Sequence, residues 1–161
     1  MKETVHIKKF FRTGNFGELK EIQIGMNRNE LINILGESNW VLKNRKSKYP
    51  TIYKYDKTEF YFEEGINGRL YGIQIKPTID AAPKLNLNIE YDFLESDLNF
   101  DSIIYELKAE QIKYELFRFK YDDEDAPLRI LTSGNVTLIF DDGYELEKAA
   151  KFEKYNEKIV S

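Results

Sequence analysis

The 161-residue chain contains no cysteine, which excludes disulfide bonds and thiolate metal sites. It has a single histidine, His6, so a Ser–His or Cys–His nucleophile system lacks its parts. His6 lies near an N-terminus that we expect to be mobile. A zinc site would have to be built from carboxylates alone, which zinc does not favour. We therefore predict no catalytic residue, no metal site and no cofactor.

Long apolar runs are also missing. No stretch approaches the roughly 18 apolar residues of a transmembrane helix, and the start "MKETVHIKKFF" is too charged for a signal peptide. These absences predict a soluble cytoplasmic protein with no membrane partner. What the chain does have is 42% hydrophobic residues with 11 Tyr, 11 Phe and one Trp, enough for a packed interior.

The net charge of −4 is unevenly distributed along the chain. Residues 1–83 hold 14 Lys plus Arg against 10 Asp plus Glu, whereas residues 84–161 hold 10 against 18. An acidic half repels nucleic acid and attracts basic surfaces. The second half is therefore either an acidic docking face or simply a solvated acidic surface.

The clearest element is a helix in "GMNRNELINILGE", residues 25–37. Asn27 and Glu30 have the spacing of a capping box, with Asn in the place of Ser or Thr. The apolar positions fall at i, i+3 and i+4: Leu31, Ile34 and Leu35. Gly36 supplies the residue that ends short helices. Both boundaries therefore predict a helix of roughly ten residues.

Strand patterns follow this helix. "NWVLK", "TIYKYD", "TEFYFEE" and "RLYGIQI" read as strands joined by turns, one of them at Asp56 and Lys57. Shorter strand patterns occur at residues 19–24 and 85–91. A helix followed by hairpin-connected strands predicts an antiparallel sheet with the helix on one face. Aromatic side chains must then alternate between the two faces of the sheet.

The second half repeats this order. The helical pattern of residues 31–35 recurs 72 positions later, Pro50 corresponds to Pro127, and "FEEG" at 62–65 corresponds to "FDDG" at 140–143. "RLYGIQI" corresponds to "ELEKAAKF", which is poor in β-formers, so a helix stays an alternative there. We predict an α+β fold of two similar units, 1–83 and 84–161, each a helix packed on an antiparallel sheet. The units would be fused into one globular protein. The alternative is a chance likeness between two helix-and-hairpin segments.

The run "IGMNRNELINILGE" followed by strands resembles the signature of small bacterial helix-plus-sheet modules of the SmpA/BamE type, which occur in tandem in the β-lactamase inhibitor protein (BLIP) fold. The positions that match are Gly25, Met26, Glu30, Leu31, Leu35 and Gly36. Asn27 replaces the usual Ser or Thr, and Ser38-Asn39 replaces the usual x-Pro. The run from "FFRTGNFGELKEIQ" to "GRLYGI" looks like small cytoplasmic bacterial proteins that often resemble immunity proteins of toxin systems. The resemblance covers about half of the chain and implies a fold more than a function.

Acidic residues gather in two places of the second half: Asp122, Asp123, Glu124 and Asp125, and then Asp141 and Asp142. The first group lacks the central glycine and terminal glutamate of a calcium-binding EF-hand loop. We predict that both groups dock on a basic partner, with Tyr121 and Tyr144 beside them as aromatic anchors. The alternative is that they are solvated loops. Glu63 and Glu64 belong to the first half, so we predict a turn position for them.

A basic run occurs in the first half, at Lys43, Arg45, Lys46 and Lys48, close to Trp40 and Tyr49. Such a pattern can contact a phosphate backbone. The run is short and lies in a net-acidic protein, so we predict no nucleic-acid partner.

Together these features favour a non-enzymatic bacterial immunity protein (antitoxin) that binds and neutralises a cognate toxin domain of the basic nuclease type. One alternative is a BamE/BLIP-like structural or regulatory protein-binding module without a toxin partner. Another is an enzyme, which would need two carboxylates converging in a pocket. Weak self-association through an edge strand stays open as well.

Overall fold

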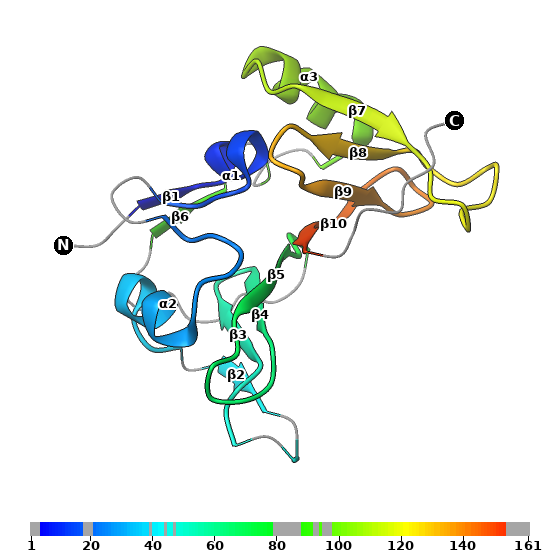
Figure 1. The fold of residues 1–161 in the computed structure, drawn as a ribbon. Coiled ribbons are helices and arrows are strands. Elements are labelled where there is room, and N and C mark those ends of the chain that lie inside the picture. The colour runs from blue at the N-terminus through cyan, green and yellow to red at the C-terminus, as the bar shows by residue number, and fades with distance from the viewer. Residues whose placement is uncertain are drawn as a thin grey trace.

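The computed structural model describes residues 4–17, 21–38, 40–43, 45–46, 48–78, 88–91, 94 and 98–153. The elements in chain order are β1 (Thr4–His6), α1 (Ile7–Thr13), α2 (Arg28–Leu35), β2 (Trp40–Leu42), β3 (Ile52–Tyr55), β4 (Thr58–Phe62), β5 (Leu70–Ile75), β6 (Asn88–Glu90), α3 (Phe100–Ala109), β7 (Tyr114–Phe117), β8 (Arg129–Thr132), β9 (Thr137–Phe140) and β10 (Leu146–Phe152). Figure 1 shows them as a ribbon.

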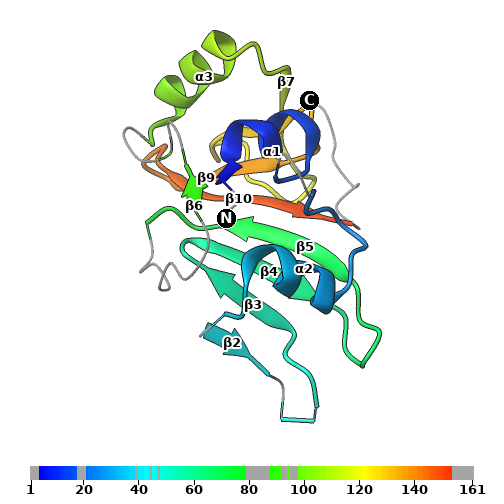
Figure 2. The same cartoon turned by 90° about the vertical axis from the view of Figure 1, so that its left-hand side faces the viewer.

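Eight strands form one antiparallel sheet in the order β2-β3-β4-β5-β10-β9-β8-β7. Strands β2 to β5 form one half of the sheet, with β2 at its edge and β5 at its centre. Strands β7 to β10 form the other half, with β7 at its edge and β10 at its centre. These two runs of strands meet where β5 pairs with β10. In Figure 2, α1 and α2 lie in front of this sheet. The predicted α+β class with an antiparallel sheet is confirmed. A separate parallel pair joins β1 to β6.

The helices α2 and α3 begin in the same way. The side chain of Asn27 accepts a hydrogen bond from Glu30 N at 2.9 Å, and that of Asn99 accepts one from Ser102 N at 2.9 Å. Each bond satisfies one of the backbone donors left unpaired at a helix N-terminus. Gly36 follows α2 with a φ of 82°, whereas Gln111 adopts the positive φ after α3. The predicted start and end of α2 are confirmed.

The expectation of a mobile N-terminus is wrong for residues 4–13. They form β1 and α1, and α1 buries Ile7, Phe10 and Phe11 completely. The ring of Phe10 stacks on that of Phe16 with centroids 4.4 Å apart, and Phe16 meets Phe60 edge-on at 6.2 Å. Burial of so much aromatic surface holds the segment against the sheet.

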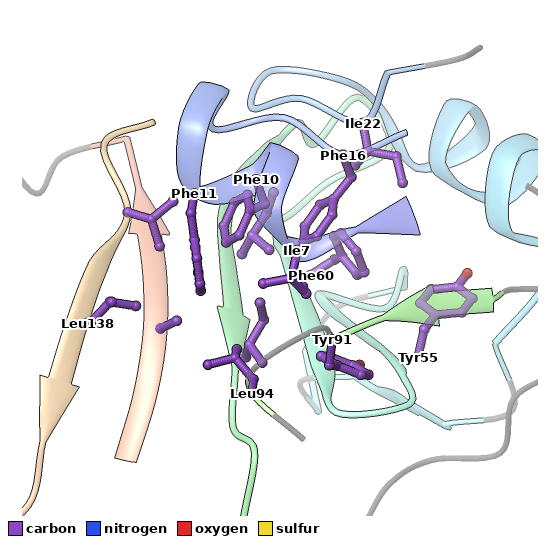
Figure 3. Packing of buried hydrophobic residues seen from close by; sticks show 14 of the residues in the cluster. Ile7, Phe10, Phe11, Phe16, Ile22, Tyr55, Phe60, Tyr91, Leu94 and Leu138 are labelled. Atoms are coloured by element: carbon purple, nitrogen blue, oxygen red, sulfur yellow. The ribbon is translucent and has the colours of Figure 1, made fainter. Parts of the chain in front are cut away.

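One apolar core contains side chains from both runs of strands. Figure 3 shows α1 between Leu138, which comes from β9, and Phe60, which comes from β4. Ile103 and Leu107 of α3 belong to the same cluster. The two runs of strands therefore share one continuous interior.

The other strand predictions have mixed outcomes. "ELEKAAKF" forms the strand β10, so the helical alternative is wrong. Ile22 makes only an isolated bridge to Phe16, while residues 18–20 lie outside the described part of the chain. The same holds for residues 85–87 of the predicted strand and for the predicted boundary at residues 83 and 84.

Aromatic residues alternate between the faces of the sheet as predicted. Tyr53, Tyr55, Phe60 and Phe62 belong to the core. Tyr61 lies on the other face, where its ring is 6.3 Å from that of Tyr71 and 5.5 Å from that of Phe152. The face away from the helices therefore carries aromatic side chains as well.

Candidate functional site: the acidic end of the sheet

Two acidic connections far apart in sequence lie at the same end of the sheet. Because β8 is antiparallel to both β7 and β9, those two strands end on the same side. The β7–β8 connection (residues 118–128) and the β9–β10 turn (residues 141–145) follow directly. Figure 1 shows the first in yellow and the second in orange. Topology thus brings the two predicted acidic groups to one end.

Asp122 has a structural role in the β7–β8 connection. Its carboxylate receives hydrogen bonds from Arg129 Nε at 2.9 Å, Arg129 Nη2 at 3.0 Å and Phe119 N at 2.9 Å. The hydrogen bonds from Arg129 lower the pKa of Asp122 below its usual value. The guanidinium of Arg129 also lies over the Phe119 ring, 4.5 Å from its centroid. Arg129 therefore neutralises the charge of Asp122 within the protein, which sets this residue apart from its neighbours.

The next three acidic residues of the connection, Asp123, Glu124 and Asp125, are exposed. Tyr121 precedes them with 86% of its surface exposed. An exposed aromatic side chain beside several carboxylates is suited to contact with another protein.

In the β9–β10 turn, Asp141 shapes the backbone and Asp142 faces solvent. Oδ1 of Asp141 accepts hydrogen bonds from Gly143 N at 2.9 Å and Glu145 N at 3.1 Å, so its side chain closes the turn. Tyr144 adopts a φ of 61° and is 49% exposed. Its ring meets Phe100 of α3 edge-on at 6.3 Å, and its carbonyl accepts the Phe100 amide hydrogen. The start of α3 thus supports Tyr144 from one side.

The balance of charge at this end is negative. The exposed carboxylates of the two connections are Asp123, Glu124, Asp125, Asp141, Asp142 and Glu145. Lys120 is the exposed cation of the same two segments, while Arg118 and Arg129 are half-buried. Arg118 donates to the carbonyl of Ala126, and Arg129 is paired with Asp122. The geometry therefore offers an acidic surface with two tyrosines.

The acidic turn of the first half, at Glu63 and Glu64, lies at the opposite end of the sheet. Because β5 and β10 are antiparallel, the turns that precede them face opposite ways. Glu63 Oε1 accepts from Arg69 N at 3.1 Å, so Glu63 shapes its turn as Asp141 does. The carbonyls of Glu63 and Gly65 accept hydrogen bonds from Arg28. Glu63 and Glu64 thus occupy a turn, as the sequence predicts.

Arg28 was not singled out by the sequence, although it anchors this opposite end. Its side chain is 7% exposed, and it donates to the carbonyls of Pro50 at 2.8 Å, Gly65 at 2.6 Å and Glu63 at 2.5 Å. It also lies over the rings of Phe62 and Tyr49. No feature of the sequence distinguishes a buried arginine at the first position of a helix from an exposed one.

Two hollows are lined by described residues. The larger, of about 630 Å³, lies at the start of α2 and includes Arg28, Glu30 and Arg69. The smaller, of about 160 Å³, includes Lys54 and Glu59. Each of these two hollows has a single carboxylate in its lining, so neither brings two acids together. Among the residues that the structure describes, no group of three or more His, Asp or Glu is placed to hold a metal ion. Within the same residues, no helix has the length and apolar character needed to cross a membrane.

Comparison of the chain with protein-family models, with curated protein sequences and with solved structures gave no match.

Proposed function

We propose that this chain is a non-enzymatic immunity protein that binds and neutralises a cognate toxin domain through the acidic end of its sheet. The observation that carries the proposal is the convergence of two acidic connections, residues 118–128 and 141–145, with Tyr121 and Tyr144 exposed beside them. The proposal places the protein in the cytoplasm, where a toxin domain would act.

The physical case rests on charge and on anchoring. A cluster of exposed carboxylates speeds encounter with a basic partner and repels acidic ones. The tyrosines supply apolar contact area with few rotatable bonds. A nuclease-type toxin carries a basic surface for its own substrate, so an acidic inhibitor fits that surface.

We also propose that the protein consists of two similar units, 1–83 and 84–161, joined where β5 pairs with β10. Several matched contacts support this. Asn27 bridges to Arg69 as Asn99 bridges to Glu145. A register shift follows the first residue of both β5 and β10. In the β5–β10 pair, Gln74 lies opposite Ala150, with Ile73 opposite Lys151 and Ile75 opposite Ala149. With Gln74 and Ala150 as equivalent positions, a two-fold rotation exchanges the pairs on either side of them, so the two strands pair symmetrically.

A BamE/BLIP-like module without a toxin partner is the alternative within the same architecture. The two differ in whether a toxin domain is encoded beside this chain. An unrelated metabolic operon around the gene would contradict the immunity proposal.

The direct test is co-expression with the C-terminal domain of a large secreted protein encoded immediately upstream. We expect the wild-type chain to restore growth and to bind that domain more tightly at low salt than at high salt. Reversal of the exposed acids in Asp123→Lys, Glu124→Lys, Asp125→Lys together should raise Kd about tenfold or more.

Asp142→Lys should act in the same direction, because Asp142 belongs to the second acidic connection. Glu64→Lys is its matched control, since Glu64 is exposed in the corresponding turn at the opposite end. If Asp142→Lys and Glu64→Lys change protection equally, or if neither the triple variant nor Asp142→Lys weakens binding, the acidic end is not the docking face.

A further inference from the structure

The outermost strand at the other edge of the sheet, β2, presents three consecutive large apolar side chains to solvent. Trp40 is 47% exposed, Val41 42% and Leu42 60%. β2 pairs with β3 on one side and stands first in the strand order, so within the described residues its second backbone edge faces no strand. An apolar edge strand of this kind is a template for the addition of another strand.

A small pocket opens beside this edge, on the face away from the helices. It has a volume of about 160 Å³ and is lined by Trp40, Leu42, Ile52, Lys54 and Glu59. Lys54 Nζ lies 4.1 Å from the centroid of the Trp40 ring, a cation–π contact that holds the indole in place. The pocket has room for an aliphatic side chain from a strand laid along β2.

The opposite edge strand, β7, differs from β2 in that its last side chain is buried. Phe117 ends β7 as Leu42 ends β2, but Phe117 is only 2% exposed. Phe119 meets its ring edge-on at 5.2 Å, and the Asp122–Arg129 pair ties the connection down. There, an aromatic side chain of the β7–β8 connection packs against the last side chain of β7. The β2–β3 connection leaves Leu42 exposed.

The positive charge that follows β2 indicates which kind of partner segment binds at this edge. Residues 43–50 contain Lys43, Arg45, Lys46 and Lys48, all exposed, and no acidic residue. Apolar side chains flanked by cations attract an apolar segment flanked by carboxylates.

We propose that the β2 edge binds an extended acidic segment of a partner protein, which adds to the sheet as an antiparallel strand. One apolar side chain of the segment fills the pocket, and its carboxylates lie beside Lys43, Arg45, Lys46 and Lys48. Since β2 ends at Leu42, antiparallel addition places the acidic flank at the N-terminal side of the partner strand. This surface is at the opposite end from the acidic connections and does not depend on the proposed function.

The test uses fluorescence anisotropy with a short labelled peptide in which a run of glutamates precedes alternating valines and threonines. We expect saturable binding at low salt that weakens as salt is added. Three matched peptides should bind about tenfold more weakly or worse: one with the glutamates moved to the C-terminus, one with lysines in their place, and one with alternate backbone amides methylated. Equal binding of the lysine or methylated peptide, or no binding of the first peptide, overturns the proposal.

Variants of the protein locate the site. Leu42→Glu, and separately the pair Arg45→Glu and Lys46→Glu, should each weaken binding about tenfold. Tyr105→Glu is the control for Leu42→Glu, because Tyr105 is 70% exposed on α3, and it should leave binding unchanged. Thermal melting confirms that each variant is folded. Unchanged binding in the β2 variants overturns the proposal. So does preference for a single-stranded oligonucleotide, or a concentration-dependent dimer abolished by Leu42→Glu, because these identify other occupants.

Discussion

Replacement of Arg28 by methionine tests a buried side chain that bonds to three carbonyl oxygens of the first half. Methionine keeps apolar contact with the rings of Phe62 and Tyr49 but removes the hydrogen bonds to three carbonyl oxygens. The variant therefore isolates the contribution of the guanidinium from that of packing.

The expected loss follows from the number and setting of these bonds. A hydrogen bond to a charged group contributes about 1.5–3 kcal/mol when buried. The sum over three such bonds is an upper limit to the loss. Arg28 itself lines the groove of about 630 Å³, so water that enters there can replace part of the lost bonding. We expect a decrease of about 3 kcal/mol in the free energy of unfolding, or a fall of roughly 6–12 °C in Tm for a chain of this size.

Urea unfolding followed by far-ultraviolet circular dichroism measures the change, and hydrogen exchange locates it. The amides of Glu63 and Leu70, which bond to Arg69 and Met26 carbonyls, should exchange faster in the variant because Arg28 holds this turn. Arg28→Lys should lie between the wild type and Arg28→Met, since an ammonium cannot reach all three carbonyls.

Arg69→Met is the matched control. Arg69 lines the same groove, but it is 58% exposed and lies 3.7 Å from Glu63 in an ion pair that contributes less than about 1 kcal/mol. A loss below about 1 kcal/mol for Arg28→Met, or equal losses for the two variants, would refute the reasoning.

Three further predictions concern backbone contact and pH. Gly134→Ala should destabilise the fold by about 2–3 kcal/mol, because a Cβ there would lie 2.4–2.7 Å from three backbone atoms of residues 10–14, whereas Gly143→Ala should cost less than about 1 kcal/mol in the same urea titration. Because the pKa of Asp122 is lowered in the folded protein, its carboxylate stabilises the fold above the ordinary carboxyl pKa, and this stabilisation is lost as pH falls through the folded pKa. Asp122→Asn should remove this part of the acid dependence of Tm, and Asp123→Asn should not. Burial lowers the pKa of Lys151, so between the folded pKa and 10.5 the unfolded chain binds more protons than the folded one. Stability should therefore rise as pH increases through this range, and Lys151→Met should abolish that rise. Persistence of the rise in the variant would show that another group causes it.

What the sequence determines by itself is local. The Asn caps of α2 and α3 and the apolar spacing on each helix involve residues at most four positions apart, so the pattern and the contact coincide. The same applies to the turns closed by Glu63 and Asp141, whose side chains bond to backbone a few residues away. These elements are predictable because their main interactions lie within a short stretch of chain.

Tertiary structure decides the features that depend on distant partners. The segment "EKAA" has weak β-propensity, yet it forms part of β10 because β5 and β9 pair with it on both sides. Its small residues also fit that place, since Ala149 is completely buried. Likewise, α1 begins at a residue without a capping side chain, and it is held in place because Phe10 and Phe11 are buried in the core.

The candidate site divides in the same way. The sequence determines that the two groups of acids exist, but the antiparallel order of β7, β8 and β9 places them at one end. The antiparallel β5–β10 pair places Glu63 and Glu64 at the other. Arg129 neutralises Asp122 because the β7–β8 connection folds back onto it. The sequence alone determines the charges and the helix caps. Pairing across the sheet decides which charges face solvent together, because that pairing depends on contacts between residues far apart in sequence.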